Sequence, residues 1–422
     1  FKSFTFICFL GCFLFYGYQG SSTEFKIKKI GKGLSNPWGI AVISKDEILV
    51  TERAGNLYKV NLINGSTISI KNVPEVVAQR QGGLLDVFVD KETKNNIYLC
   101  FSKQETEGVS TALSVSSLRN NELVSTKILF SANNRSNSAV HFGCRIGVKD
   151  KFIYMSIGDR GDRYQSQNTL SHAGSVIKVN KYDGSTHESS NIENNWLPEL
   201  FTKGHRNPQG MAINSVTGDI WINEHGPKGG DEINVLKRGR NYGWPVVTHG
   251  EEYFGGKIGE GIKTLKGFQD PIWVWIPSIA PSGMAFYEGD MFPEFKGHLL
   301  VSSLKFKSLY LVKLSNGLPY TEEFFFKNKF GRIRDIEELN DGSITREQNS
   351  VIDDIEATAL ELLSAKQLVT IELFDEKCTR KNVDSVYLAL SKSIRPQDDF
   401  ILFFSGHASE NLMMYDDVEK IL

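Results

Sequence analysis

The 422-residue sequence predicts an all-β fold, a six-bladed β-propeller with an incomplete last blade, followed by a partial α/β segment. Three observations support this prediction. Short apolar strands recur in groups from Phe25 onward, no long amphipathic helix is indicated before residue 345, and the pattern changes to helix and strand after Ser343. Strand groups that repeat every ~45–70 residues fit propeller blades better than a sandwich, whose strands come at even spacing.

The strand groups can be read in chain order. The first is GIAVI, EILVTE and NLYKVN; the second is LLDVFVD and NIYLCFS; the third is CRIGV, FIYMSIGD and SVIKVNKYDG. The fourth is GMAIN, DIWINE and EINVLKRG; the fifth is GMAFYEGD, HLLVSSL and LYLVKLSNG. The sixth begins with IRDIEELNDGS and stops, so only the N-terminal FKIKKI remains to complete it. Because a ring needs its last blade to cover strand edges, we expect lowered stability and weakened support of Arg332 and Arg334.

Residues 1–22 are predicted to be a signal peptide, with an uncleaved anchor as the alternative. Lys2 precedes a short apolar run, Phe4 to Phe15, and small residues follow it. A run of this length is typical of a secretory signal rather than a membrane span. We therefore expect a periplasmic or secreted protein with no membrane span in the mature chain.

Charge and cysteine content exclude several classes of protein. The net charge is -2 and the pI about 6.5, which argues against a nucleic-acid partner. The sequence has five cysteines: Cys8, Cys12, Cys100, Cys144 and Cys378. They form no CxxC pair and no metal-ligand spacing, so neither a disulfide framework nor a zinc site is indicated.

The polar residues that indicate chemistry are concentrated between Gly204 and Glu232. This stretch opens with Arg206 and Asn207, passes through two strand patterns, and closes on EHGP and GGDE. Its loops would present a guanidinium, an amide, backbone carbonyls and carboxylates at one end of a sheet. Such a set suits an anionic, metal-chelating ligand, although a solvated hairpin with polar turns remains the alternative.

Several motifs extend this interpretation. They are NPWGIAV, LVTERAGNLYKV, QGGLLDV, HFGCRIGV, SIGDRGD, GHRNPQGMA, EHGPKGGDEIN, GRNYGWPV, WIPSIAPSGMAFY, SSLKFKSLYLVKL and GRIRDI. In these motifs, residues from about 25 to 343 resemble the soluble quinoprotein glucose dehydrogenase family, in its aldose sugar dehydrogenase (glucose/sorbosone dehydrogenase) branch. The resemblance implies a six-bladed propeller that binds pyrroloquinoline quinone (PQQ) and Ca²⁺ on one face. It also implies that an aldose sugar is oxidised and that an external acceptor takes the electrons.

The resemblance assigns roles to three residues near the substrate. His141, in AVHFG, matches the catalytic histidine, a general base that takes the anomeric hydroxyl proton while hydride moves to the quinone. Gln81 matches an amide placed near substrate and cofactor. Trp275 matches an aromatic side chain beside the sugar, and a core role is equally consistent with its residue type.

The resemblance also assigns cofactor and metal contacts. The cofactor contacts are Arg206, Asn207, Lys305, Arg332 and Arg334, whose cations suit a ligand with three carboxylates. The carbonyl oxygens of Gly226 and Pro227 match calcium ligands. Glu232 is assigned either to a second, structural calcium or to capping of local backbone groups.

The loop SIGDRGDR is expected to have a structural role. It contains Asp159, Asp162 and Arg163 at the end of a strand pattern. We predict that these residues stabilise the turn through ion pairs.

Residues 346–422 resemble the caspase-like fold. SVIDDIEATALELLSA has helical spacing, and DDFILFFSGHA is a strand pattern that ends at His407, which matches that family's catalytic histidine. Caspase-like peptidases need a cysteine on a later strand, and the last cysteine, Cys378, precedes His407. We therefore expect no peptidase activity.

Two functions are consistent with this sequence. The first is a PQQ- and calcium-dependent sugar dehydrogenase. The second is a catalytically impaired propeller fused to a peptidase remnant, either a binding or structural module or the product of a chimeric gene. Aldose-dependent dye reduction in the presence of the quinone and calcium distinguishes the two.

Overall fold

The computed structural model describes residue 25 and residues 27–31, 33–90, 92–93, 96–186 and 195–348. The chain divides into two compact units, residues 1–358 and 359–422, and all described residues belong to the first. The predicted signal segment, the helix-and-strand pattern after residue 348, Cys378 and His407 lie outside the described residues.

Five four-stranded antiparallel sheets and one two-stranded sheet make up the described part of the chain. Blade 1 contains β1 (Pro37–Val42), β2 (Glu47–Glu52), β3 (Asn56–Asn61) and β4 (Thr67–Ser69). Blade 2 contains β5 (Leu84–Val89), β6 (Asn96–Glu105), β7 (Gly108–Arg119) and β8 (Glu122–Ser131). Blade 3 contains β9 (Ile146–Lys149), β10 (Phe152–Ile157), β11 (Ser175–Asn180) and β12 (Leu200–Lys203).

The remaining sheets follow the same order. Blade 4 contains β13 (Pro208–Ile213), β14 (Ile220–Glu224), β15 (Asp231–Val235) and β16 (Trp273–Trp275). Blade 5 contains β17 (Pro281–Phe286), β18 (Leu299–Ser303), β19 (Ser308–Ser315) and β20 (Leu318–Phe325). The closing sheet contains β21 (Ile333–Glu338) and β22 (Ile344–Gln348). Two short 3₁₀ turns, η1 (Arg163–Gln167) and η3 (Pro293–Phe295), lie in loops.

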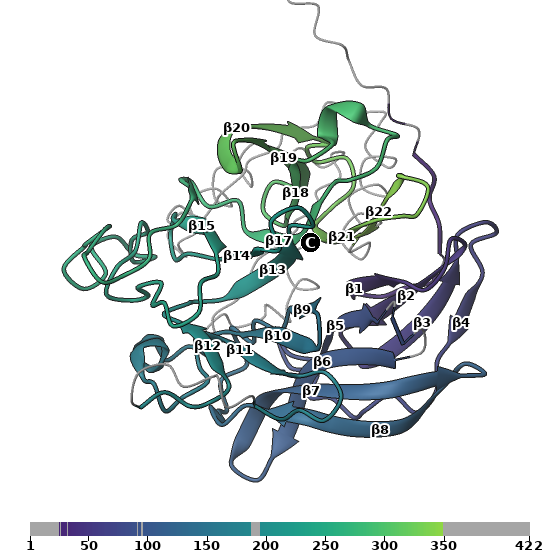
Figure 1. Cartoon of the computed structure of the whole chain (residues 1–422), viewed down its shortest axis with the longest axis horizontal. Coiled ribbons are helices and arrows are strands. Elements are labelled where there is room, and N and C mark those ends of the chain that lie inside the picture. Colours follow the sequence, from purple (N-terminus) through teal and green to yellow (C-terminus); the bar gives the residue numbers. More distant parts are fainter. Residues whose placement is uncertain are drawn as a thin grey trace, which may run out of the picture. The chain divides into compact units, whose positions relative to one another are not determined.

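The sheets form a ring. Their first strands contact one another in the sequence β1, β5, β9, β13, β17, β21 and back to β1, around the centre of the view in Figure 1. The predicted all-β propeller is therefore confirmed. The second strands are almost completely buried, as in EILVTE and IWINE, because sheets pack on both of their faces.

Every boundary between neighbouring sheets carries a hydrogen bond between a side chain of one sheet and a backbone group of the other. Around the ring these are Thr51 Oγ1 to Leu85 O (2.6 Å), Ile146 N to Asp86 Oδ2 (2.8 Å), Arg145 Nε to Gln209 O (2.6 Å), Asn223 Nδ2 to Ser282 O (2.7 Å), Ser282 Oγ to Ile333 O (2.7 Å) and Ile40 N to Asp335 Oδ2 (2.8 Å). These buried hydrogen bonds set the register between neighbouring sheets. If one sheet slid past the next, buried polar groups would be left unpaired.

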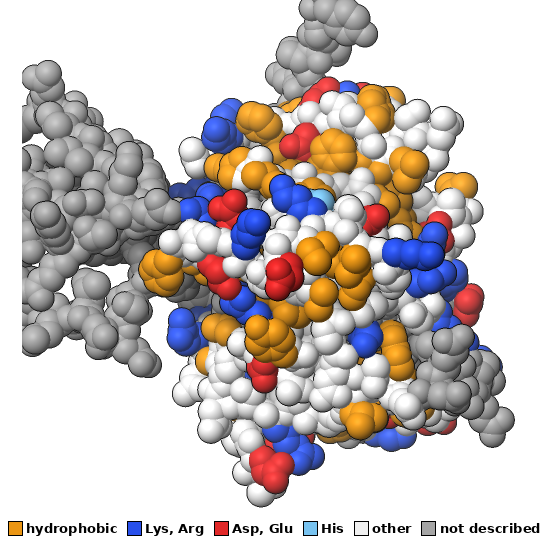
Figure 2. Space-filling model, turned by 90° about the vertical axis from the view of Figure 1, so that its left-hand side faces the viewer, with side chains coloured by type: hydrophobic (Ala, Val, Ile, Leu, Met, Phe, Trp, Pro, Cys, Tyr) orange, Lys and Arg blue, Asp and Glu red, His pale blue; other side chains and the backbone are white. Residues whose placement is uncertain are grey.

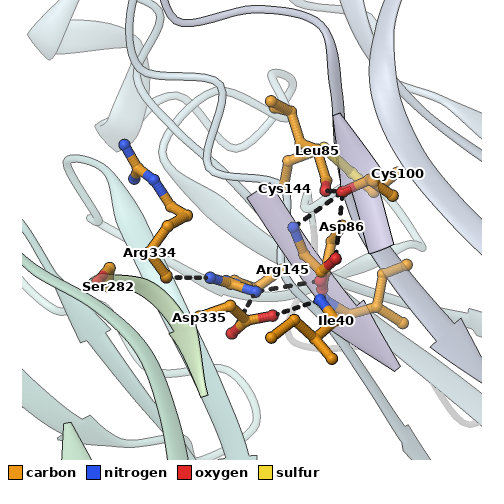
Figure 3. A network of polar contacts seen from close by, with 12 residues as sticks. Ile40, Leu85, Asp86, Cys100, Cys144, Arg145, Ser282, Arg334 and Asp335 are labelled. Carbon is orange, nitrogen blue, oxygen red and sulfur yellow. Dashed lines mark hydrogen bonds and ion pairs between the residues drawn. A yellow bond between two sulfur atoms is a disulfide. The ribbon is translucent and has the colours of Figure 1, made fainter. Parts of the chain in front are cut away.

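The central ion-pair network connects the first strands of several sheets (Figure 3). The Arg145 guanidinium lies 3.1 Å from Asp86 Oδ1 and 2.9 Å from Asp335 Oδ1, and Nη2 donates to the carbonyl oxygen of Arg334 at 3.0 Å. The guanidinium carbon of Arg145 lies over the Trp38 ring, 4.2 Å from the ring centroid. All three charged side chains are buried, so this network ties the beginning of the ring to its end.

The expectation of no disulfide was wrong. Cys100 in β6 and Cys144, just before β9, form a disulfide with Cα atoms 5.6 Å apart. The two residues are 44 positions apart and belong to neighbouring blades, so no short spacing reveals the pair. The ring geometry brings them together, and the bond lies in the buried core between blades 2 and 3.

The expectation that the strand pattern ends at Ser343 was also wrong. Ser343 N donates to Asp341 Oδ1 at 2.9 Å and Gly342 has a φ of 79°, which forms a tight turn into β22. Strand β22 then pairs with β21, giving the closing sheet two strands rather than one. The described N-terminal residues, 25, 27–31 and 33–36, add no strand to it. Phe25 instead contacts aromatic rings of blade 5 and the loop after it, among them Phe292 in a tilted and Phe326 in an edge-on arrangement.

The surface is of mixed charge on the face drawn in Figure 2. Basic and acidic side chains are scattered there among small groups of apolar ones, in keeping with the net charge of -2. Among the described residues, none of the helices has the length and apolarity needed to cross a bilayer.

Candidate active site

The predicted site residues lie at one end of the ring. They precede first strands, as Gln81, His141 and Arg206 do, or follow second strands, as Gly226 and Lys305 do. In an antiparallel blade the start of the first strand and the end of the second strand lie at the same edge. The sequence motifs therefore come together because of the meander topology.

His141 is paired with a buried carboxylate. Its Nδ1 lies 2.6 Å from Asp159 Oδ1, and the other oxygen of Asp159 accepts a hydrogen bond from Trp244 Nε1 at 2.8 Å. Gly161 N also donates to Asp159 Oδ1 at 2.8 Å. A carboxylate at Nδ1 favours the tautomer with the proton on Nδ1, so Nε2 carries the lone pair that can accept a proton.

The surroundings keep this imidazole neutral near pH 7. Burial lowers the pKa of His141, and the positive charge of Arg206 lowers that pKa further, against the opposing effect of Asp159. Burial, the largest single effect, would raise the pKa of Asp159, but the hydrogen bond to His141, the Gly161 N–H and the positive charge of Arg206 together outweigh burial, so the pKa of Asp159 is lowered. The pair is thus a neutral histidine held by an ionised carboxylate, which is the state a general base needs.

The turn that carries His141 is anchored at several points. His141 N donates to Gln81 Oε1 at 2.8 Å, and Gly143 N donates to Asn207 Oδ1 at 3.2 Å. His141 and Cys144 both have left-handed backbones, with φ values of 51° and 76°. Non-glycine residues adopt this conformation only when their surroundings hold them there. Here the anchors are the two side chains and the disulfide.

Arg206 and Asn207 lie next to this turn. Arg206 Nη1 donates to the carbonyl oxygen of Gly226 at 2.8 Å, and its guanidinium carbon lies 5.4 Å from the centroid of the Trp244 ring. The backbone N of Arg206 donates to buried Glu224 at 2.7 Å. The structure therefore brings Arg206, Asn207 and the Gly226 loop together with His141, as predicted.

Two further arginines enter from the start of the closing sheet. Arg334 Nη1 donates to Gln209 Oε1 at 2.9 Å. Burial lowers the pKa of Arg332, and none of the described acidic residues forms an ion pair with it. By accessible surface Arg332 is only partly buried, and a partly buried guanidinium without a carboxylate partner among the described residues favours an anionic ligand.

His225 shows that these cations lie close together. Burial first, and then the positive charges of Arg334 and Arg206, lower the pKa of His225 to about 3, and His141 contributes as well. Its Nε2 lies 2.7 Å from the carbonyl oxygen of Pro281, so Nε2 carries the proton. His225 was not singled out from the sequence, yet it lies among three of the predicted residues.

Two of the predicted site residues, Lys305 and Trp275, lie outside the group of contacts around His141. Lys305 is exposed on the turn between β18 and β19, and its backbone N donates to Ile279 O at 3.2 Å. The Trp275 indole is buried between blades 4 and 5 and donates to Glu322 Oε2 at 2.7 Å. The packing role that its residue type allowed is thus observed.

Glu232 lies opposite a second acidic residue, the buried Glu224. It pairs with Glu224 across β14 and β15, and Asn234 Nδ2 donates to both, at 3.3 and 3.0 Å. Burial, followed by the charge of Glu224, raises the pKa of Glu232 well above its usual value. Across the described ranges, no group of three or more His, Cys, Asp or Glu side chains is arranged to hold a metal ion.

The prediction of turn-stabilising ion pairs in SIGDRGDR was wrong for all three residues, because none of them forms an ion pair within the turn. Asp159 turns inward to His141, whereas Arg163 reaches a distant loop and pairs with Glu252 at 2.5 Å. Asp162 makes no side-chain capping bond at the start of η1. Asp159 was missed as a functional residue because its partners, His141 and Trp244, are far away in sequence.

The residues fit an anionic cofactor better than they fit a free metal ion. Among the described residues Arg332 has no carboxylate partner, and the positive charges of Arg206 and Arg334 both act on the neutral His225. The carbonyl oxygen of Gly226 accepts from Arg206, and that of Pro227 accepts from Ser278 Oγ at 3.4 Å. Calcium requires six to eight oxygens, so most would have to come from a ligand or water.

The fold and site together define a β-propeller with a neutral histidine–carboxylate pair and several arginine side chains at one end of the ring. The chain belongs to the Glucose / Sorbosone dehydrogenase family, whose model matches residues 34–351. This match extends past Ser343 and includes β22.

Relatives and solved structures agree with this family. The chain is similar to the aldose sugar dehydrogenase YliI of Escherichia coli, with 33% identity over 73% of this chain and 86% of that protein. It is also similar to quinoprotein glucose dehydrogenase B of Acinetobacter calcoaceticus, with 26% identity over 77% and 85% of the two chains. The PQQ-bound form of an aldose sugar dehydrogenase from Streptomyces coelicolor superimposes with a TM-score of 0.60 at 25% identity, over 74% of this chain and 87% of that one.

Proposed function

We propose that this protein oxidises an aldose sugar with PQQ and Ca²⁺ as cofactors, and that His141 is the general base. The observation that carries the proposal is the neutral His141, which is fixed by Asp159 and lies near the positive charge of Arg206. Arg332, at the start of the closing sheet, adds a cation with which none of the described acidic residues forms an ion pair. The family membership and the PQQ-bound relative support the choice of cofactor. We also propose that the closing sheet is the sixth blade of the ring.

The chain's own residues would divide the work as follows. Arg206, Asn207, Lys305, Arg332 and Arg334 would hold PQQ, which supplies a hydride acceptor when bound. His141 Nε2 would take the proton from the anomeric hydroxyl, and Asp159 would stabilise the imidazolium that forms. Gln81, which already accepts from the backbone of His141, would orient the sugar with its amide, and Trp275 would support that side of the site.

We assign Ca²⁺ to two places. One is at the carbonyl oxygens of Gly226 and Pro227 together with oxygens of the cofactor, which requires Arg206 to release Gly226. The other is Glu232, where a cation would relieve the repulsion between two facing carboxylates. Calcium-dependent thermal stability, compared between the wild type and Glu232→Gln, tests the second place independently of activity.

We place the protein in the periplasm or outside the cell. The buried Cys100–Cys144 disulfide supports this localisation, because such bonds form and persist in oxidising compartments.

The decisive experiment is reconstitution with PQQ and Ca²⁺, followed by aldose-dependent dye reduction. We expect His141→Gln to lower kcat about 10²–10⁴-fold while PQQ still binds. Because the pKa of His141 is lowered, kcat/KM should stay constant down to pH values below 6.5 before it falls. Tight PQQ binding without turnover in folded wild-type protein would favour the alternative, an impaired propeller that acts as a binding module.

A further inference from the structure

An aromatic cavity lies between blades 4 and 5. It has a volume of about 330 Å³, and its walls come from β16, the turn after β18, and strands β19 and β20. Trp273, Trp275, Phe306 and Tyr310 provide the aromatic walls, and Glu322 is the single charged lining residue. Sites for small molecules span about 300–1,000 Å³, so this cavity suits a ligand at the small end of that range.

Glu322 is oriented by the two indoles. Trp275 Nε1 and Trp273 Nε1 both donate to the same oxygen, Oε2, at 2.7 and 3.2 Å. Among the described residues, no donor is bonded to the other oxygen, Oε1. The cavity thus offers one fixed hydrogen-bond acceptor surrounded by ring faces and aliphatic side chains.

The charges around the cavity select against ionic ligands. An anion would be repelled by Glu322 at the cavity wall. Two lysines flank the aromatic wall, with Nζ of Lys305 and Lys327 at 5.7 and 5.8 Å from the centroid of the Phe306 ring, and they would repel a cation. A neutral ring with apolar faces and hydroxyl donors satisfies both conditions, because its faces pack on aromatic rings and a hydroxyl reaches Oε1.

The cavity shares a chain segment with the candidate active site. The backbone N of Gly230 donates to Trp275 O at 2.9 Å, and Ser278 Oγ donates to Asp231 Oδ1 at 2.9 Å. Asp231 in turn accepts from the backbone N of Gly226 at 2.8 Å. The segment from Trp273 to Ile279 therefore lines the cavity and also contacts the loop that carries Gly226.

We propose that this cavity is a second sugar subsite, which binds one neutral pyranose unit of an oligosaccharide whose reducing end is oxidised at the His141 site. Only the oxidation of the reducing end at the His141 site rests on the proposed function. Sugar binding in the cavity itself requires neither PQQ nor calcium.

The test compares Glu322→Gln with Glu323→Gln. Glu322 lies at the cavity, whereas neighbouring Glu323 is exposed and pairs with Lys313 at 2.5 Å. Tryptophan fluorescence of the cofactor-free protein is titrated with maltose and with glucose, and kinetics are measured on the PQQ- and calcium-loaded enzyme. We expect Glu322→Gln to weaken maltose binding and to raise KM for maltose about tenfold. We expect kcat and the KM for glucose to be unchanged, and Glu323→Gln to behave as wild type.

The outcomes separate this proposal from the proposed function. Maltose-dependent fluorescence that Glu322→Gln weakens, in a protein with no turnover, supports the subsite and contradicts the oxidation. Turnover of maltose with equal KM values in the wild type and Glu322→Gln overturns the subsite alone. Tighter binding of tetramethylammonium than of maltose also overturns it, since that result would make the cavity a cation site. Trp273→Phe serves as a second variant, because it removes one indole donor and retains an aromatic wall.

Discussion

Two groups of arginines lie near the first strands, and they differ in their partners. In the central network Arg145 is shared by two carboxylates, Asp86 and Asp335. In the candidate site Arg332 has no carboxylate partner among the described residues. Figure 3 shows how closely the two groups approach: the Arg334 carbonyl accepts from Arg145, while the Arg334 guanidinium extends away from the network. Matched charges hold the ring together, and unmatched ones provide attraction for a ligand.

The largest effect should come from breaking the matched group. Arg145→Met leaves Asp86 and Asp335 buried without their cation, and we expect a loss of about 3–5 kcal/mol in the free energy of unfolding. Denaturant titration measures it. Arg119→Met, at an exposed arginine on the hairpin of β7 and β8, is the control and should change stability by less than about 0.5 kcal/mol.

Removal of the disulfide should have the second-largest effect on stability. Replacing both Cys100 and Cys144 by Ser releases a loop of 44 residues, for which chain entropy alone gives about 4 kcal/mol. We also expect kcat to fall more than KM rises, because the turn with His141 loses one of its anchors. Unchanged kcat in the folded double variant would show that Gln81 and Asn207 suffice to hold that turn.

The pH dependence of stability sharpens the comparison. Burial raises the pKa of Asp86 to about 7, with Asp335 raising it further and Arg145 opposing. The folded state therefore binds a proton more tightly than the unfolded state, so this group makes stability fall as pH rises from about 4 to about 7. The slope is at most about 1.4 kcal/mol per pH unit. Asp86→Asn should flatten the profile, measured by thermal unfolding at a series of pH values.

The smallest effect should come from the unmatched group, and it should have the opposite sign. Arg332→Met removes a partly buried charge that has no ion-pair partner among the described residues, so we expect the cofactor-free protein to gain up to about 1 kcal/mol in stability. Affinity for PQQ should fall at the same time, as measured by absorbance titration. A loss of stability comparable to that of Arg145→Met would mean that Arg332 is structural.

The sequence predicted the ring well because blade strands are local. Apolar runs such as EILVTE and IWINE follow from burial on both faces, and motifs such as GHRNPQG lie at the same edge once the strands alternate. The tail of the closing sheet was misread, because ITREQ is polar and its strand character comes from pairing with β21.

Contacts between blades could not be read from the sequence. Trp244 and Asp159 are 85 residues apart, and Trp275 and Glu322 are 47 apart. Asp159 was given a local role because only its neighbours in sequence were visible. His141, Arg206 and Gly226 were found because they stand inside long motifs, whereas the aromatic cavity depends on side chains from two blades.

The bond from Ile40 N to Asp335 has a practical consequence. Its two residues are 295 positions apart, so this amide proton is protected by the far end of the propeller rather than by a strand beside it. Its hydrogen–deuterium exchange rate therefore reports on separation of the first and last sheets, while amides within blade 1 report on that blade alone. A single resonance can thus follow the opening of the whole ring.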